Sequence, residues 1–176
     1  MLTISELQLA VEAWSKRNFP DSPWQHALAG VVEEIGELSH SVLKMAQDIR
    51  GSRDKHLADA KDAVADTAIY LADYLCKIGF QFADGVTFAM FQDEARKLGN
   101  DDGDTPVNKI LMTAAIAGRL IEEPNDDNVA LLLAGLADVS ESLGIDFQNA
   151  VETTWNEVSA RDWQSNRVNG QATRES

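Results

Sequence analysis

The chain has 176 residues, of which 44% are hydrophobic and 25% charged, so it can bury one well-filled core and has the composition of an ordinary globular protein. Its formal net charge of −14 excludes broad electrostatic attraction to nucleic acid or to an anionic membrane. A single cysteine, Cys76, excludes an internal disulfide and a cysteine-based zinc site.

Helical spacing of apolar residues recurs along the whole chain, and no alternating strand pattern stands out. Pro23 and Pro106 follow capping residues at helix starts, whereas Gly79 and Gly144 mark helix ends. These signals predict seven helices, over residues 3–18, 23–48, 54–78, 82–98, 105–122, 127–143 and 146–163. We therefore expect an all-α fold, an antiparallel helical bundle. Because no apolar stretch is as long as a membrane span and the N-terminus has no signal-peptide pattern, we expect a cytoplasmic protein.

The chain contains a faint internal repeat. Segment 78–86 resembles segment 143–151, and Leu-Ala-Asp precedes each of them at matching distance. We therefore predict one compact domain made of an acidic helical half over 1–98, a degenerate repeat of it over 99–165, and a polar tail over 166–176. Under this alignment the second half has Ala115, Ile116 and Arg119 in place of the acidic residues of the first, so we expect it to be structural.

Two acidic groups occur on consecutive predicted helices. The first group is Glu33, Glu34 and Glu37, and the second is Asp59, Asp62, Asp66 and Asp73. A short connection makes the two helices antiparallel neighbours, which places Glu37 and Asp66 at roughly the same level. An acidic stripe on a single helix is most often a solvated face. Carboxylates that oppose each other across two helices, however, repel unless a cation lies between them.

This pattern indicates a site for a divalent metal ion. Carboxylate oxygens without cysteine favour a hard cation, Mg²⁺ or alternatively Mn²⁺. Such an ion completes its coordination shell with water and with the phosphates of a substrate, so it would bring an anionic nucleotide to an acidic protein. Hydrolysis of a phosphoanhydride is the reaction that follows most naturally.

The same residues carry a family resemblance. The run Glu33-Glu34-x-x-Glu37, followed after about 25 residues by an acidic pair inside 62–71, resembles the E-E-x-x-E and E-x-x-D signature of the MazG-type all-α nucleotide pyrophosphohydrolases. Dimeric dUTPases and dCTP pyrophosphatases share the pattern. The resemblance covers residues 23–78 well and 127–163 loosely. It implies Mg²⁺-dependent cleavage of a nucleoside triphosphate to monophosphate and pyrophosphate, and a homo-oligomer, dimer or higher, whose pocket is closed partly by another subunit.

The resemblance also implies roles for single residues. Glu34, Glu37 and Asp66 match metal-ligand positions, Glu33 matches the Glu that orients or deprotonates the attacking water, and Tyr70 matches a position that contacts the nucleotide.

The chain departs from the signature at Ala63, where the second motif has Glu. Asp62 is the neighbouring carboxylate that would replace this ligand, although a one-residue displacement rotates it by about 100° around the helix. A catalytically weakened or inactive helical scaffold protein is therefore an alternative.

Basic residues near the predicted turn offer phosphate contacts. We consider Lys44, Arg53 and Lys55 as substrate-binding residues, although a basic connection between helices is usually only solvated. Glu37 and His40 have the Glu-x-x-His spacing of di-iron bundles, but that architecture requires a second such pair, which the other histidines do not supply.

Overall fold

The computed structural model describes residues 1–98, 104–168 and 170, so the first residues of the predicted repeat over 99–165 and most of the polar tail over 166–176 lie outside the described residues. Within the described part the chain forms seven helices and no strand, which confirms the all-α expectation. The helices are α1 (Ile4–Asn18), α2 (Trp24–Gln47), α3 (Arg53–Ile78), α4 (Phe88–Leu98), α5 (Pro106–Glu122), α6 (Asp126–Leu143) and α7 (Phe147–Ser159). No one helix among the described residues has the length and hydropathy to cross a membrane, and only α6 and α7 pass that test jointly, with a bend of 104° between them.

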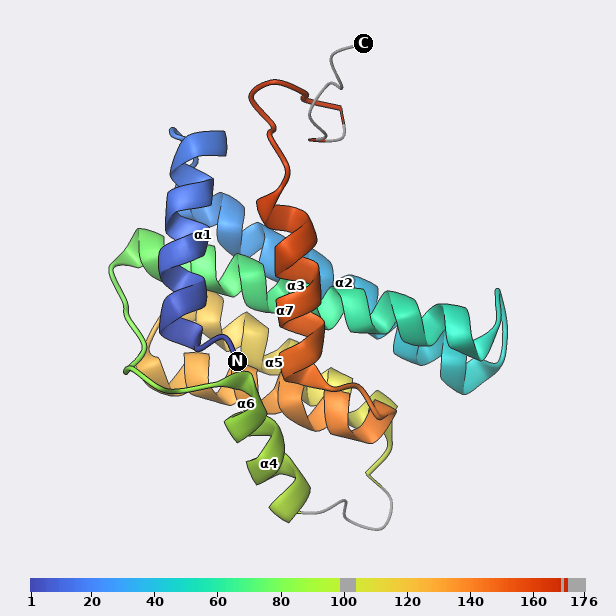
Figure 1. The fold of residues 1–176 in the computed structure, drawn as a ribbon. Helices are drawn as coiled ribbons and strands as arrows, with labels where there is room; N and C mark the ends of the chain where they lie inside the picture. Colours follow the sequence, from blue (N-terminus) through green and yellow to red (C-terminus); the bar gives the residue numbers. More distant parts are fainter. Residues whose placement is uncertain (99–103, 169, 171–176) are drawn as a thin grey trace.

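Two helical hairpins form the centre of the fold. Hairpin α2–α3 packs on hairpin α5–α6 through α2 on α5 and α3 on α6 (Figure 1). Helices α1 and α7 pack on α3, and α4 packs on α6. In the view of Figure 1, α2 and α5 lie at the back of the molecule. Helix α4 of the first half thus packs on the second half, and α7 of the second half packs on the first.

In each hairpin a glycine accepts a side chain from the facing helix. A Cβ atom on Gly30 would lie 2.4 Å from Cδ1 of Tyr70, and a Cβ atom on Gly135 would lie 2.8 Å from Oγ1 of Thr113. These close approaches fix the register of each pair, because a larger residue at either glycine would displace the helix opposite. The two hairpins are alike in this respect, but the internal repeat of the sequence stays a prediction.

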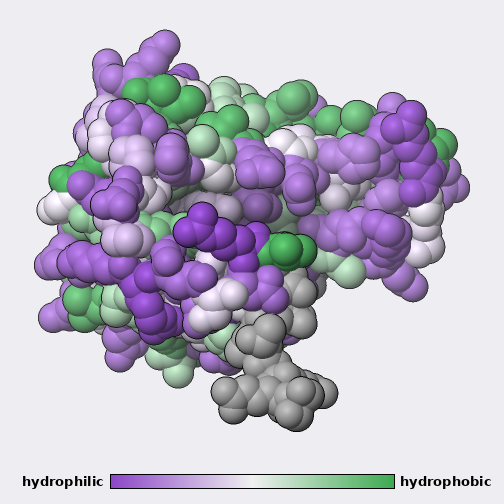
Figure 2. Space-filling model, turned by 90° about the horizontal axis from the view of Figure 1, so that it is seen from above, coloured by the Kyte–Doolittle hydropathy of each residue, from purple (hydrophilic) through white to green (hydrophobic). Residues whose placement is uncertain are grey.

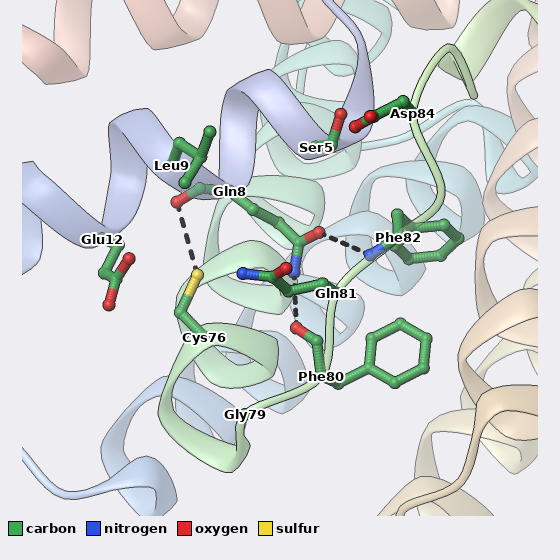
Figure 3. Close-up of a pocket in the computed structure, with 10 residues that line it drawn as sticks. All are labelled: Ser5, Gln8, Leu9, Glu12, Cys76, Gly79, Phe80, Gln81, Phe82 and Asp84. Carbon is green, nitrogen blue, oxygen red and sulfur yellow. Dashed lines mark hydrogen bonds between the residues drawn. The ribbon is translucent and has the colours of Figure 1, made fainter.

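Helix α4 begins at Phe88 rather than at residue 82, so the predicted start was wrong. Gln8 of α1 holds residues 80–82 in an irregular conformation. Its side-chain amide donates to the carbonyl oxygen of Phe80 (3.0 Å), and its side-chain oxygen accepts from the backbone N–H of Phe82 (3.0 Å), at the edge of a cavity of about 260 Å³ (Figure 3). Gly85, with φ of 82°, then turns the chain into α4.

Helix α7 ends at Ser159 rather than at residue 163, because the chain there turns onto α1. The side-chain oxygen of Asn18 accepts the backbone N–H of Trp163 (2.8 Å), and the indole N–H of Trp14 donates to the carbonyl oxygen of Arg161 (3.2 Å). These bonds fix the position of the segment that follows α7.

The turn between α2 and α3 is held by a buried histidine. Asp48 and Arg50 adopt left-handed backbone conformations, with φ of 51° and 63°, which non-glycine residues rarely do. Nε2 of His56 lies 3.0 Å from the carbonyl oxygen of Ile49, and because a carbonyl only accepts, this nitrogen is the donor. His56 is 3% exposed. The bond therefore ties the strained turn to the first turn of α3.

We predict that His56→Ala lowers the free energy of unfolding by roughly 2 kcal/mol, through loss of this hydrogen bond and of a buried ring. Urea unfolding followed by circular dichroism measures the change. The control, His26→Ala, removes an exposed imidazole from the start of α2 and should change the free energy by less than about 0.5 kcal/mol. Equal effects of the two substitutions would contradict the role given to His56.

Candidate functional site

Hairpin α2–α3 brings the two acidic motifs together. Tyr70 lies against Gly30, and the two helices are antiparallel. The residue one turn after Gly30 on α2 therefore lies opposite the residue one turn before Tyr70 on α3. Glu34 and Asp66 are therefore opposite each other, and Asp66 is the charged group with the largest effect on the pKa of Glu34. Glu37 lies one turn further along α2, near the level of Ala63 rather than level with Asp66.

The carboxylates differ in burial. Glu34 and Asp66 are half-buried, whereas Glu33, Glu37 and Asp62 are exposed. Glu34 is the innermost carboxylate of α2, and its neighbour Ile35 belongs to the hydrophobic core. The cluster therefore has an inner pair, Glu34 and Asp66, and an exposed rim.

The environment of the inner pair disfavours negative charge. Burial, together with the charges of Asp66, Glu37, Glu33 and Asp62, raises the pKa of Glu34 to about 8. Burial and the charge of Asp62 raise the pKa of Asp66 to about 6. The pKa of Tyr70 is raised as well, by burial and by Glu34. Carboxyl groups in this state gain stability from any cation that comes close to them.

The exposed carboxylates surround a polar hollow of about 430 Å³, a volume within the range of small-molecule sites. Its lining consists of Glu33, Gly36, Glu37, His40, Ser41, Asp59 and Asp62. Neither Glu34 nor Asp66 lines the hollow, whose lining residues lie between the inner pair and the turn that joins α2 to α3. It is a concave, acidic surface beside the two most perturbed carboxyl groups of the cluster.

Lysines neutralise both ends of the acidic stripe on α3. Lys55 Nζ lies 2.5 Å from Asp59 Oδ2, and Lys77 Nζ lies 2.6 Å from Asp73 Oδ1, each four residues away on the same helix. The stripe therefore has a basic neighbour at each end. In its middle, neither Asp62 nor Asp66 has an ion pair with another described residue.

The three basic residues expected to bind substrate lie away from the inner pair. Lys55 is engaged with Asp59 at the rim of the hollow, and Lys44 donates to the side-chain oxygen of Gln47 (3.2 Å). Arg53 is exposed at the first position of α3. None of them is among the charges that act on Glu34 or Asp66.

The basic residue that does act on the cluster is Arg161, which sequence reasoning did not select. It opposes the rise in the pKa of Asp62, Asp66 and Tyr70, while Glu157 of α7 adds to the rise for both aspartates. Helix α7 packs on α3 and brings these two residues to the acidic motif from more than 90 positions away in the chain. The loose resemblance over residues 127–163 was the only signal for Arg161 in the sequence.

The carboxylates fit a divalent cation by chemistry, but they do not form a finished coordination site. The donors are all oxygen, they carry excess negative charge, and the raised pKa of Glu34 shows that this charge is not compensated. In the part of the chain that the structure describes, however, no three His, Cys, Asp or Glu side chains are placed so that they could hold a metal ion. Glu34, Glu37, Asp62 and Asp66 would have to rotate toward one another to bind an ion.

We predict that the metal-free protein loses stability as the pH rises from about 5 to 8. The folded state keeps the proton of Glu34 up to a pKa of about 8, whereas the unfolded chain releases it near 4.5, so between these values the folded state binds more protons and raising the pH favours unfolding. Glu34→Gln should flatten this dependence and stabilise the protein at pH 8 by about 1–3 kcal/mol, a range reduced for partial exposure of the side chain.

Urea unfolding in the presence of EDTA, at several pH values, checks this. Glu122→Gln, at an exposed position outside the cluster, should keep the pH dependence of the wild type. A pH dependence that survives Glu34→Gln unchanged would show that Glu34 is not its source.

Comparisons with protein-family models, with curated proteins and with solved structures find no match for this chain. The resemblance to MazG-type enzymes, carried by the acidic motifs, therefore stays a prediction, and the activity is argued from the site alone.

Proposed function

We propose that this protein is an Mg²⁺-dependent nucleoside triphosphate pyrophosphohydrolase, with Mn²⁺ as a possible substitute, that acts in nucleotide-pool housekeeping. The observation that carries the proposal is the half-buried pair Glu34 and Asp66, which oppose each other across α2 and α3 and make no ion pair with another described residue. A hard divalent ion relieves this repulsion with the ligand type that it prefers. Its remaining coordination positions would take phosphate oxygens, which supports a nucleotide as the substrate.

Each carboxylate then has a role in the proposal. Glu34, Glu37, Asp62 and Asp66 hold Mg²⁺, which when bound supplies charge neutralisation for the phosphates. Glu33, at the edge of the hollow, accepts a proton from water as the water oxygen bonds to the α-phosphorus. The bond from the α-phosphorus to the oxygen that bridges to the β-phosphate breaks, and pyrophosphate leaves with that oxygen.

Other residues would position the nucleotide. The ring of Tyr70 lies against the backbone of Gly30, one turn from Asp66, and offers an aromatic surface beside the inner pair. Lys55, Arg53 and Lys44 lie toward the turn and are proposed for the distal phosphates, Lys55 after it leaves Asp59. The hollow between these two groups is where the triphosphate would lie.

A second candidate function is a MazG-like interaction or scaffold protein without activity. The observation that favours it is Ala63, which stands where the second motif has Glu and is only 2% exposed. Its small side chain is enclosed by core residues, so the position no longer serves a ligand. Metal binding separates the two candidates, because a scaffold with an eroded site needs no cation.

We predict that the wild type releases pyrophosphate from at least one of a panel of common and modified deoxynucleoside triphosphates with Mg²⁺, and not with EDTA. Asp66→Asn should lower the rate by about 100-fold or more. Substitution of a residue that only hydrogen-bonds to a metal ligand already costs up to about 100-fold, and Asp66 is proposed to be a ligand itself. The matched control is Asp73→Asn, on the same stripe but paired with Lys77, which should keep the rate. The enzymatic proposal fails if no nucleotide is hydrolysed, or if Asp66→Asn and Asp73→Asn are equally active.

We also predict that millimolar Mg²⁺ raises the melting temperature of the wild type at pH 8, because a ligand that binds only the folded state stabilises it. The shift should be absent in Asp66→Asn and present in Asp73→Asn. Differential scanning fluorimetry measures it without reference to catalysis. A shift without turnover would favour an inactive metal-binding protein, and no shift in the wild type would remove the metal site.

A further inference from the structure

A cavity of about 510 Å³ lies between α4 and hairpin α5–α6 and shares no lining residue with the acidic hollow. Helices α4 and α5 both pack on α6, but among the described residues they make little contact with each other, which leaves this space between them (Figure 1). Apolar side chains from all three helices line it, among them Phe91, Leu98, Met112, Ile116 and Leu131. A largely apolar cavity of this volume is typical of small-molecule sites.

The apolar side chains are gathered at one end of the cavity. On the face that Figure 2 shows, by contrast, hydrophobic groups lie singly or in small groups among hydrophilic ones. Thr113 of α5 lies against Gly135 of α6, and both residues line the cavity. Because the two helices are antiparallel, Ile116, one turn after Thr113, lies opposite Leu131, one turn before Gly135. These two side chains form the apolar end.

The other end of the cavity is a buried ion pair. One turn before Thr113, Nζ of Lys109 lies 2.5 Å from Oδ1 of Asp138, and the side chain of Lys109 is only 2% exposed. Exchange of a buried ion pair for apolar residues of similar volume is often neutral or stabilising, so stability alone does not explain this pair. A few polar groups at one end of an apolar cavity are what orients a bound small molecule.

The charge that a ligand can reach at this end is negative. Lys109 is covered, whereas the side chain of Asp138 is 34% exposed, and its second carboxylate oxygen makes no hydrogen bond with another described residue. Asp104 also lines the cavity and is exposed, while Glu94 lines it but forms an ion pair with Lys97 (2.6 Å). The net charge of −14 adds attraction for a cation. A positively charged head group is therefore complementary to this end.

We propose that this cavity binds a small organic amine, with its ammonium group against Asp138 and its apolar body against Ile116 and Leu131. Lys109 and Ile116 are seven residues apart on α5, so the ligand spans about 10 Å from head to body. The site lies outside the acidic motifs and does not depend on the proposed function, since its test measures binding of an amine and not hydrolysis of a nucleotide.

Titration of the full chain with 4-phenylbutylamine, followed by NMR of the backbone amides, tests the proposal. Saturable shifts should occur in residues 91–98, 109–116 and 131–138. The probe 4-phenylbutyrate has the same apolar body but a carboxylate head, and it should bind at least about 10-fold more weakly, because a hydrogen bond to a charged group contributes enough for that factor.

A substitution at the apolar end tests where the body of the ligand lies. Leu131→Asn should weaken binding of 4-phenylbutylamine by about 10-fold, because it removes apolar area from the contact. The matched control is Leu43→Asn on α2, at a leucine of similar exposure, 40% against 45%, which should leave the affinity unchanged.

An exchange of the ion pair tests the head group. Lys109→Met combined with Asp138→Leu replaces both partners by apolar residues, so the protein should fold, and it should lose most of the preference for the amine over the carboxylate. The matched control, Lys77→Met combined with Asp73→Leu, removes an ion pair of α3 outside the cavity and should keep the preference. Circular dichroism checks the fold of each variant.

Three results would overturn the proposal. They are the absence of saturable binding, equal affinity for the amine and the carboxylate, and shifts confined to other regions, such as the acidic hollow or residues 76–84 at the cavity of Figure 3. If the double variant does not fold, the position of the shifts, the comparison of the two probes and Leu131→Asn still decide the question.

Discussion

The close packing of Tyr70 on Gly30 sets the geometry on which the candidate site depends. A glycine at position 30 leaves no Cβ, so the tyrosine ring reaches the backbone of α2 and fixes one relative height of α2 and α3. That height puts Glu34 opposite Asp66. The interior of the hairpin holds the pair in place from below, through core residues such as Leu38 and Val64, which are fully buried. Any slip of the register would separate the two carboxyl groups, because residues one position away point to other sides of the helix.

This arrangement is unfavourable for folding when considered alone. Burial and the charge of Asp66 raise the pKa of Glu34, burial and the charge of Asp62 raise the pKa of Asp66, and further carboxylates surround the pair at the rim. Like charges are rarely placed together in partly buried positions unless a function requires it. The unfavourable placement of Glu34 opposite Asp66 is therefore the feature that indicates a functional site. Arg161 is the cation that moderates the conflict. Its position depends on the hydrogen bonds that hold the end of α7 on α1, at Trp14 and Asn18.

Much of the fold could be predicted from the sequence, because the helices and their ends depend on short stretches of neighbouring residues. The apolar period, the cap Thr105 before Pro106, and the glycines that end α3 and α6 are all properties of a few neighbouring residues. The cap expected before Pro23 was wrong, because Pro23 is itself the N-cap of α2 and no side chain caps that helix. The start of α4 was predicted too early, since the hydrogen bonds of Gln8 to residues 80–82 join segments more than 70 positions apart.

The site was predictable in part for the same reason. The acidic motifs lie on consecutive helices, so a short turn was enough to bring them together. The inner position of Glu34 depends on the packing of α2 on α5, and the presence of Arg161 depends on α7, neither of which a linear pattern reveals. The lysines that neutralise Asp59 and Asp73 were present at a spacing of four residues and offered a local signal that these aspartates are ordinary ion-pair partners.

The central claim is that the inner carboxyl pair is built to exchange a proton for a hard cation. Isothermal titration of Mg²⁺ into the protein near pH 7, in buffers of different ionisation enthalpy, tests it most directly, because metal binding must displace the proton that Glu34 holds up to a pKa of about 8. The account predicts release of about one proton for each ion bound, and no release in Glu34→Gln. Absence of binding, or binding with no dependence on the buffer, would contradict it.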